Sequence, residues 1–540
     1  MNNKKSVLLL ASVMVASGAL LAACRANTEE KNAAPTAGAS AGAQPDKVNA
    51  DGMPIVKNPI NLEFFAPKRF AASDWNNILL WQEYEKLTNV KVKWNTVDRD
   101  NLVEKRNILL AGGDYPDALY GNRLTPSDLM MYGEQGVFVK LNDLIDKYAP
   151  NFKKLLDQYP DVKKAITMPD GNIYSFPTVT DPEFKSMLTG AFMWYKPDWL
   201  EKTGLPEPQT TDDFYRFLKA IKEKDPNTIP LGGGPGWDYL GKYLQGAWGL
   251  GNRGTTHPYV DVDPATNELR FIPADDRYKE MLQYTNKLYN EGLIDKDFFT
   301  ANADQIIAKG SKGVYAVIAD YNPEAVYSNL KGYVGAAALK GPHGDRIYSY
   351  IGSPVGSPGQ FVITKKNKYP EATVRWVDYL YSDEGSKMFF MGFKDKTYVE
   401  KPDGTIDYTD EIKHNPKGLT QDQAVSQYLV WPGVGYPGIL KQNYFKGAEG
   451  MPASVEAAKK VEPAFIKERW APFNYTKEET ERMTVLRADI ETYVKEMTTK
   501  FITGGASFDE WSKYTDTLKK MGLSEYMKIY KAGYERYKKN

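Results

Sequence analysis

The side chains that most often carry catalysis are sparse in this sequence. Histidine occurs only at His257, His343 and His414, and no two of these have the spacing of a zinc site such as His-Glu-x-x-His. Asp and Glu together number 69, so many folds could bring two carboxylates to the separation that a glycosidase uses. The sequence therefore leaves open a secreted polysaccharide-degrading enzyme.

The only cysteine, Cys24, follows Leu20-Leu21-Ala22-Ala23. A basic start and an apolar run from Val7 to Ala23 precede it, which is the layout of a secretory signal peptide. The ending resembles the lipobox of bacterial lipoproteins, in which the signal is cleaved before the cysteine and its thiol is diacylated. We expect residues 1–23 to be the signal and Cys24 the lipid attachment site, anchoring the protein to the outer face of the cell membrane. A plain secretion signal and an uncleaved membrane anchor are the alternatives.

Length and composition favour a protein of two or more lobes that carries no overall charge. Removing the signal leaves 517 residues (540 minus 23), more than one hydrophobic core usually organises. Lys plus Arg and Asp plus Glu both number 69, so no overall positive field attracts nucleic acid. Residues 24–54 are rich in Ala, Gly, Pro, Asn and Thr, which predicts a flexible tether.

Aromatic residues are abundant, with 36 Tyr, 22 Phe and 11 Trp. Such a composition suits carbohydrate recognition, because flat rings stack on sugar C–H faces while their polar tips bond hydroxyls. Large cores also consume aromatic residues. Each individual ring could therefore belong to the core or to a site.

Loops after predicted strands supply the candidate ligand-binding residues, because α/β clefts form at strand ends. Trp237 follows a glycine-rich loop, and Arg69 could donate a bidentate bond to an acidic sugar. For every candidate, core packing, capping or simple surface exposure is the competing interpretation. The candidates are Trp237, Trp431, Tyr195, Trp75, Asp74, Trp248, Arg69 and Tyr436.

The periodicity of the sequence predicts the α/β class. Alternating runs at 60–64 and 90–94 predict strands, and an amphipathic helix with Ser73 as its N-cap lies between them. A helix over 100–111 and a strand near 116–120 follow. Strand–helix–strand order predicts a mostly parallel sheet covered by helices. Capping boxes are predicted at 210–213 and 507–510.

Five segments resemble a known family. They are residues 110–117 (LAGGDYPD), 171–177 (GNIYSFP), 198–206 (DWLEKTGLP), 379–385 (YLYSDEG) and 501–504 (FITG) with Glu510-Trp511. Together they are similar to the extracellular solute-binding proteins of bacterial ABC transporters, in particular the sugar-binding lipoproteins.

The resemblance implies a two-lobed periplasmic-binding-protein-like fold of type II. Each lobe would be a mostly parallel sheet flanked by helices, with the ligand in the cleft between lobes. The expected bounds are 55–185 plus about 325–390 for lobe 1, and about 186–324 plus about 391–540 for lobe 2. It implies a non-enzymatic receptor that captures an oligosaccharide and delivers it to the permease subunits of an ABC transporter. A receptor for a peptide or another small solute is the alternative on the same fold.

Relatives in this family often carry a calcium loop after Lys-Asp-Pro. Here residues 224–230 are too short and contain too few oxygen ligands for calcium. We therefore expect no bound metal. Separately, we expect no cofactor, no nucleic-acid partner and a monomeric protein.

Overall fold

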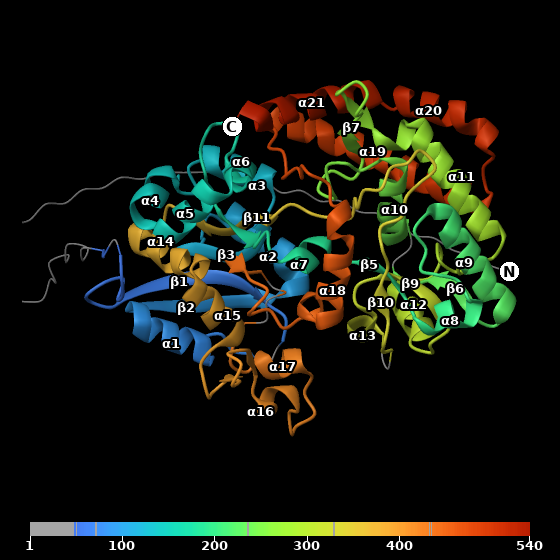
Figure 1. Cartoon of the computed structure of the whole chain (residues 1–540). Helices are drawn as coiled ribbons and strands as arrows, with labels where there is room; N and C mark the ends of the chain where they lie inside the picture. The colour runs from blue at the N-terminus through green and yellow to red at the C-terminus, as the bar shows by residue number, and fades with distance from the viewer. Residues whose placement is uncertain are drawn as a thin grey trace, which may run out of the picture. The chain divides into compact units, whose positions relative to one another are not determined.

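The computed structural model describes residues 48–49, 51–70, 73–234, 237–327, 330–430, 433 and 435–539. The predicted signal peptide, Cys24, most of the tether and Trp431 lie outside these residues. The described chain forms two larger sheets, each with its own helices (Figure 1). None of the helices in the described ranges has the length and apolar character needed to cross a membrane.

The first sheet belongs to lobe 1 and has six strands in the order β14-β4-β11-β3-β1-β2. β1, β2 and β3 are mutually parallel, β11 runs against both of its neighbours, and β4 and β14 are parallel to each other. The prediction of a mostly parallel sheet is confirmed for this lobe. The strands are β1 Ile60–Lys68, β2 Val90–Asp98, β3 Ala118–Leu124, β4 Phe176–Thr180, β11 Val355–Ile363 and β14 Ile439–Leu440.

Helices cover both faces of this sheet because successive strand residues point to opposite sides. Phe65 belongs to a small cluster with residues of α2 and α3, whereas Phe64 points into the larger core with α1 and α14. The helices of lobe 1 are α1 Leu79–Thr88, α2 Leu102–Gly112, α3 Pro126–Glu134, α4 Asn142–Tyr148, α5 Pro150–Gln158, α6 Pro160–Ile166, α14 Pro370–Asp378 and α15 Asp383–Met391.

The core of lobe 1 is a dense aromatic cluster. Phe64 packs edge-on against Trp94 and Trp376, with ring centroids 5.4 and 5.2 Å away. Trp81 of α1 stacks on Trp94 at 4.8 Å. Helix α1 begins later than predicted, with Ile78 at its N-cap, so Ser73 does not cap it. Much of the tryptophan in the sequence is thus used in packing.

Lobe 2 contains a four-stranded sheet in the order β10-β5-β9-β6. β6 and β9 pair in parallel, while β5 runs against both β9 and β10, so this sheet is mixed, with β5 as its reversed strand. The strands are β5 Phe192–Tyr195, β6 Ile229–Gly232, β9 Tyr315–Asp320 and β10 Val334–Gly335, with a separate hairpin of β7 Val260–Val262 and β8 Leu269–Phe271. The helices are α8 Asp198–Thr203, α9 Thr211–Lys224, α10 Trp237–Gln245, α11 Asp276–Asn290, α12 Ala303–Gly310 and α13 Pro323–Val326.

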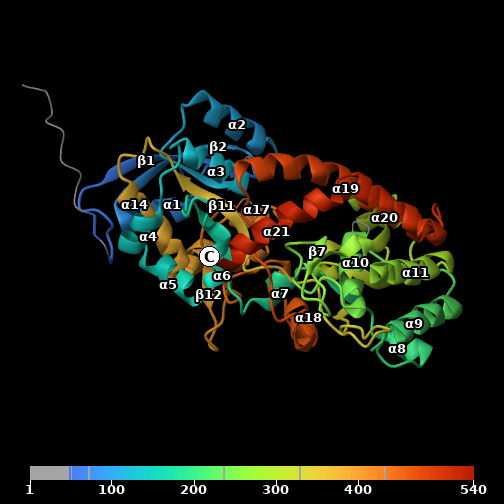
Figure 2. The ribbon, with the colours of Figure 1, turned by 90° about the horizontal axis from the view of Figure 1, so that it is seen from above.

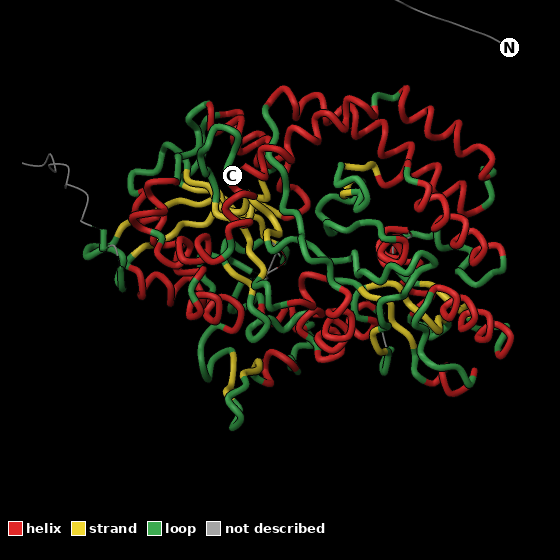
Figure 3. The backbone as a smooth tube through the Cα atoms, turned by 45° about the horizontal axis from the view of Figure 1, so that its top comes forward, coloured by secondary structure: helices red, strands yellow, loops and turns green. Residues whose placement is uncertain are grey.

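The chain passes between the sheets after β4, before β11 and after β14, largely as loops (Figure 3). Because β10 joins the lobe 2 sheet and β14 joins the lobe 1 sheet, the expected boundaries at about 324 and 391 are each too early. The remaining elements before the last crossing are α7 Lys185–Thr189, β12 Tyr398–Glu400, β13 Ile406–Tyr408, α16 Asp410–Lys413 and α17 Gln421–Val425.

The C-terminal helices contact both lobes. Helix α19 packs along α11 of lobe 2 and also meets α3 of lobe 1. Asn474 Nδ2 donates to the carbonyls of Ala165 and Thr167, and Lys164 Nζ lies 5.5 Å from the Tyr537 ring. Figures 1 and 2 both place the C-terminus beside α6. These helices are α18 Pro452–Val461, α19 Lys477–Thr503, α20 Trp511–Lys520 and α21 Leu523–Lys539.

The predicted capping boxes are confirmed. Thr210 and Asp213 exchange reciprocal hydrogen bonds at the start of α9, and Ser507 and Glu510 do the same before α20. Each pair satisfies backbone N–H groups that the first turn of a helix leaves without partners.

Candidate functional site

In lobe 1, the carboxyl ends of the parallel strands meet the crossings between lobes. β1 and β3 are parallel, and β11 begins opposite the end of β3, with Gly359 facing Leu124. β4 ends on the same edge, because Val179 near its end pairs with Val355 at the start of β11. The chain therefore leaves lobe 1 from the edge where β1, β3 and β4 end.

Lobe 2 repeats this arrangement. Phe192, the first residue of β5, pairs with Asp320, the last residue of β9. β6 ends beside β9, with Gly232 opposite Ile318. The loops after β6 and β9 therefore flank the crossing that enters β5. In open α/β sheets, ligands bind beyond the carboxyl ends of strands, so the two edges beside the crossings are the candidate site.

The lobe 1 edge contains a cavity of about 350 Å³. Arg123 from the end of β3 and Gln360 from β11 both line it, so two neighbouring strands each contribute a hydrogen-bonding side chain. The complete lining is Arg123, Thr178, Gly356, Ser357, Gln360, Phe390, Gly435, Tyr436 and Leu440. We call these residues the lobe 1 cavity.

The backbone is irregular at both Arg123 and Gln360. Arg123 has a φ of 48°, in the left-handed region that side chains with a Cβ rarely adopt. The buried Arg106 of α2 donates to the carbonyl of Asn122 at 2.8 Å and that of Arg123 at 3.5 Å, which holds this conformation. Opposite, the register of β11 shifts between Gly359 and Phe361. Bulges of this kind re-aim a side chain, here Gln360.

Polar groups in the lobe 1 cavity have unused hydrogen-bonding capacity. Gln360 is 3% exposed, and its Oε1 has no hydrogen-bond partner among the described residues. Arg123 donates to the carbonyl of Gly433 at 2.6 Å. The surrounding walls desolvate its guanidinium and Arg99 adds a like charge, and both effects lower the pKa of Arg123. Gly435 adopts a φ of 125°, and a Cβ there would lie 2.5 Å from Gln360 Oε1.

The lobe 2 edge is aromatic. The ring of Tyr239, in the first turn of α10, lies 5.5 Å from that of Tyr321 and 5.9 Å from that of Tyr350, both edge-on. Tyr321 follows β9, and Tyr350 belongs to the crossing before β11. All three rings are half-buried. Lys242 Nζ lies 5.4 Å from the Tyr350 ring, and desolvation lowers the pKa of this lysine. We call Tyr239, Tyr321 and Tyr350 the tyrosine cluster.

A glycine loop positions the tyrosine cluster. Gly233 and Gly234 both have positive φ, at 87° and 62°. The N–H of Gly234 donates to the buried carboxylate of Asp320 at 3.1 Å, and the Tyr327 hydroxyl donates to the same oxygen at 2.6 Å. The end of β9 thus holds the loop that leads into α10 and Tyr239.

Three of the predicted candidates lie at the lobe 1 edge. Arg69 and Asp74 are exposed in the loop after β1. Asp74 accepts hydrogen bonds from the N–H of Asn76 and from Asn77 Nδ2, and the bond from Asn76 is the main reason that its pKa is lowered. Tyr436 lines the lobe 1 cavity, but it is 2% exposed and its hydroxyl donates to a backbone carbonyl within the lobe.

Trp237 is half-buried in the first turn of α10, directly after the glycine loop. Its indole packs over Gly241, where a Cβ would lie 2.5 Å from the ring. It lines a small cavity of about 60 Å³ with residues of α11 and α19, including Tyr278 and Lys495. The tyrosine cluster does not line this cavity.

Two further candidates fill buried positions. Trp75 is 2% exposed and packs edge-on against Trp94 and Tyr120, at 5.1 and 5.8 Å. Tyr195 is 6% exposed and ends β5, with Lys460 Nζ 5.4 Å from its ring. Both positions correspond to the core interpretation of these rings.

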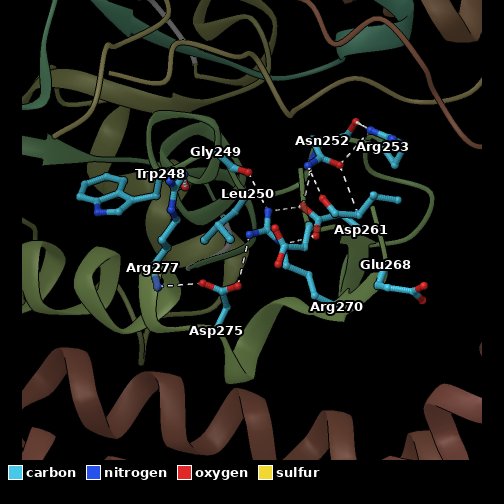
Figure 4. Close-up of polar contacts among 12 residues, drawn as sticks. Trp248, Gly249, Leu250, Asn252, Arg253, Asp261, Glu268, Arg270, Asp275 and Arg277 are labelled. Atoms are coloured by element: carbon cyan, nitrogen blue, oxygen red, sulfur yellow. Dashed lines mark hydrogen bonds and ion pairs between the residues drawn. The ribbon is translucent and has the colours of Figure 1, made fainter. Parts of the chain in front are cut away.

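Trp248 ends a short 3-10 helix, Gly246–Trp248, and two arginines bond the backbone there (Figure 4). Arg277 donates to the Trp248 carbonyl at 3.2 Å, and Arg270 donates to the Gly249 carbonyl at 2.8 Å. Arg270 also pairs with the buried Asp261 at 2.6 Å. The Trp248 ring is 2% exposed against Tyr284 and lines a separate cavity. The surroundings of Trp248 are therefore those of a residue that packs within the fold.

The candidates predicted from the sequence do not include the residues at the centre of either edge. In lobe 1 these are Arg123 and Gln360, and in lobe 2 they are the three members of the tyrosine cluster. Pro358-Gly359 before Gln360 and Gly121 before Arg123 were signals of irregular strands. Tyr321 directly follows a strongly apolar strand, which was a signal of a strand-end position.

The segment 224–230 does not fit calcium. Asp225 is the only carboxylate in this segment. Its oxygens accept hydrogen bonds from the N–H of Asn227 and the hydroxyl of Thr228. These bonds make a compact turn in place of an oxygen cage. Within the described ranges, no group of three or more His, Cys, Asp or Glu residues could hold a metal.

The chain matches the family model described as bacterial extracellular solute-binding protein, over residues 74–387. The protein belongs to this family. Along 565 aligned positions it is 31% identical to the fructooligosaccharide ABC transporter substrate-binding protein FusA of Streptococcus pneumoniae, covering 100% of this chain and 98% of the relative. It is also 27% identical to the polygalacturonan/rhamnogalacturonan-binding protein YtcQ of Bacillus subtilis, covering 58% of this chain and 57% of that one.

Solved structures agree on the fold. The Streptococcus pneumoniae FusA complex with kestose superposes with a TM-score of 0.68 at 28% identity, covering 89% of this chain and 100% of that one. Family members of this kind are two-lobed solute-binding proteins, and the two sheets joined by crossings described above have this organisation.

Proposed function

We propose that this protein captures an oligosaccharide between its two lobes and delivers it to the permease of an ABC importer. The observation that carries the proposal is the convergence of the two strand-end edges on the crossings. One edge offers hydroxyl, amide and guanidinium groups, and the other offers a cluster of tyrosine rings. Stacking combined with polar donors is the chemistry of sugar recognition. The binding of short fructans by its relative FusA supports this ligand class.

The proposed activity is binding without turnover. Closure of the lobes around the sugar would change the surface that the permease contacts, so that occupancy is signalled. The predicted lipid on Cys24 would anchor the protein to the membrane, and residues 24–54 would act as the tether. A cell envelope that does not retain soluble proteins would otherwise lose the receptor.

Thermal melting against glycans and peptides tests the proposal, because a ligand that binds only the folded state raises the melting temperature. Oligosaccharides should raise it and remain intact on incubation. A shift with peptides alone would contradict the sugar assignment, and released sugar products would favour the enzyme. Replacing Cys24 by Ala should release the protein into the medium and abolish uptake while ligand affinity stays unchanged.

A further inference from the structure

The charge of the lobe 1 cavity is unbalanced. Arg123 is the one charged side chain among its described lining residues, and the others are neutral. No carboxylate of the described chain lies within ion-pair distance of Arg123, while Arg99 contributes a like charge nearby. Arg123 uses one N–H on the Gly433 carbonyl, and a guanidinium has five. Among the described residues no other acceptor is bonded to Arg123, which leaves its remaining donors for a ligand.

Two local irregularities of the backbone shape the lobe 1 cavity. A left-handed residue and a shifted register on adjacent strands both direct side chains to the same space. Unfavourable backbone conformations persist only where surrounding structure imposes them. Arg106 does so here from beneath, and its own charge is balanced by Asp128 at 3.6 Å. The supporting arginine is thus paired with an acid of the protein, whereas Arg123, which faces the cavity, is not.

We propose that the lobe 1 cavity binds a sugar residue carrying a carboxylate, with Arg123 as its bidentate partner. The proposal rests on the proposed function, because it specifies which oligosaccharides the site takes. A planar guanidinium matches a carboxylate with two parallel hydrogen bonds. The amide of Gln360 and the hydroxyls of Ser357 and Thr178 would bond the hydroxyls of the same ring. A volume of about 350 Å³ accommodates a single sugar residue.

The test compares ligands that differ only in charge. Galacturonate, glucuronate and mannuronate oligomers are titrated calorimetrically against their methyl esters, and neutral kestose is included. At least one acid should bind about tenfold tighter than its ester, and 0.5 M salt should reduce this preference. Arg123→Gln should weaken binding of that acid at least about tenfold more than binding of its ester. Arg123→Lys should restore only part of the preference, because an ammonium lacks the fork.

Arg346→Gln is the matched control, because Arg346 is also exposed and donates to a backbone carbonyl, that of Gln209. Thermal melting verifies that each variant is folded. Equal or tighter binding of the esters, binding of kestose alone, or an equal loss for acid and ester in Arg123→Gln would overturn the inference while the proposed function stands. If no oligosaccharide of either kind binds, the proposed function falls and the inference falls with it.

Discussion

The two edges of the site are shaped by different means. In lobe 1 the backbone does the shaping, through the positive φ of Arg123 and the shifted register at Gln360. In lobe 2 the positive-φ glycines lie in the loop before α10, and the site itself is made of side chains, with Tyr239 in the first turn of α10 facing two other rings. Where the backbone conformation shapes a site, a substitution in the residues that hold that conformation should disturb the whole site. Where separate side chains make the site, one side chain can be removed while the others keep their positions. The lobes should therefore respond differently to substitution.

One buried histidine of lobe 2 and one buried carboxyl of lobe 1 have pKa values shifted in opposite directions. His257 of lobe 2 is buried beside Phe473 and Tyr530, and burial lowers its pKa to about 4. Asp378 of lobe 1 accepts from the N–H of Phe152 and from Asn151, yet burial raises its pKa to about 6. Acidification therefore acts in opposite directions on these two groups.

The largest expected effect is on acid stability. Between pH 6.5 and 4 the unfolded chain protonates His257 and the folded chain does not, so the free energy of unfolding should fall by about 3 kcal/mol. His257→Gln should remove this loss in urea denaturation at pH 7 and pH 4.5.

Between pH 6 and pH 4, the folded chain protonates Asp378 before the unfolded chain does, which adds to the free energy of unfolding as the pH falls. Asp378→Asn removes this gain, so the free energy of unfolding should fall further on acidification than in the parent protein.

His414→Gln is the control for this comparison, because its side chain is 78% exposed. It should leave the difference between the two pH values unchanged. An equal pH response in His257→Gln and the parent protein would contradict the assignment of acid sensitivity to His257.

Gly359→Ala should damage the lobe 1 edge next most strongly. A Cβ at this position would lie 2.2 Å from the Leu124 carbonyl oxygen, so β3 and β11 must separate. Overpacking of this kind costs about 1–3 kcal/mol, and sugar affinity should fall by about tenfold or more, because Arg123 and Gln360 flank the contact. Calorimetric titration and thermal melting measure both effects.

Gly112→Ala serves as its matched control. Nothing lies within 4 Å of a Cβ at Gly112, and alanine favours the helix that ends there. Stability and affinity should both be retained. Unchanged affinity in Gly359→Ala would instead show that the geometry of lobe 1 is not needed for binding.

Tyr239→Ala should weaken sugar binding by about tenfold, because it removes the ring that contacts both Tyr321 and Tyr350, and aromatic contacts contribute about 0.5–1.5 kcal/mol beyond their buried area. Melting in the absence of ligand should change little. Tyr289 of α11 has a half-buried ring beside that of Phe299, and Tyr289→Ala should not alter affinity. Loss of affinity in both variants would point to general destabilisation.

The smallest effect is expected for Tyr321→Phe, which keeps the ring and removes only the hydroxyl. If the lobe 2 edge acts by stacking, the dissociation constant should rise by less than about threefold. A tenfold rise in titration calorimetry would show that the hydroxyl bonds the ligand, and the contrast between a polar and an aromatic edge would then weaken.

Much of the fold could be predicted from periodicity and capping. The alternation at 60–64 and 90–94 and the capping boxes at Thr210 and Ser507 are local signals, and the structure contains the strands and helices that they predict. The direction of β5 and β10 is not local. It depends on where the crossings return the chain, which periodicity does not encode.

The site was harder to predict because residue type does not distinguish a packing ring from a binding ring. Trp75 follows β1, as a ligand contact would, but Trp94 and Tyr120 enclose it. Arg123 lies within a strand, where the alternation pattern describes it as an ordinary exposed residue. Its position in the cavity depends on a backbone angle imposed by Arg106, which is distant in sequence and carries no motif.

The last strand of lobe 1, β14, has a consequence for how the protein is made. The lobe 1 sheet draws on segments between residues 60 and 440, so it cannot be completed until most of the chain is available. Asn474 and Tyr537 add contacts from still later segments. Pairings so distant in sequence form slowly. We expect the newly made chain to stay largely unfolded during export and to reach its compact state only on the far side of the membrane.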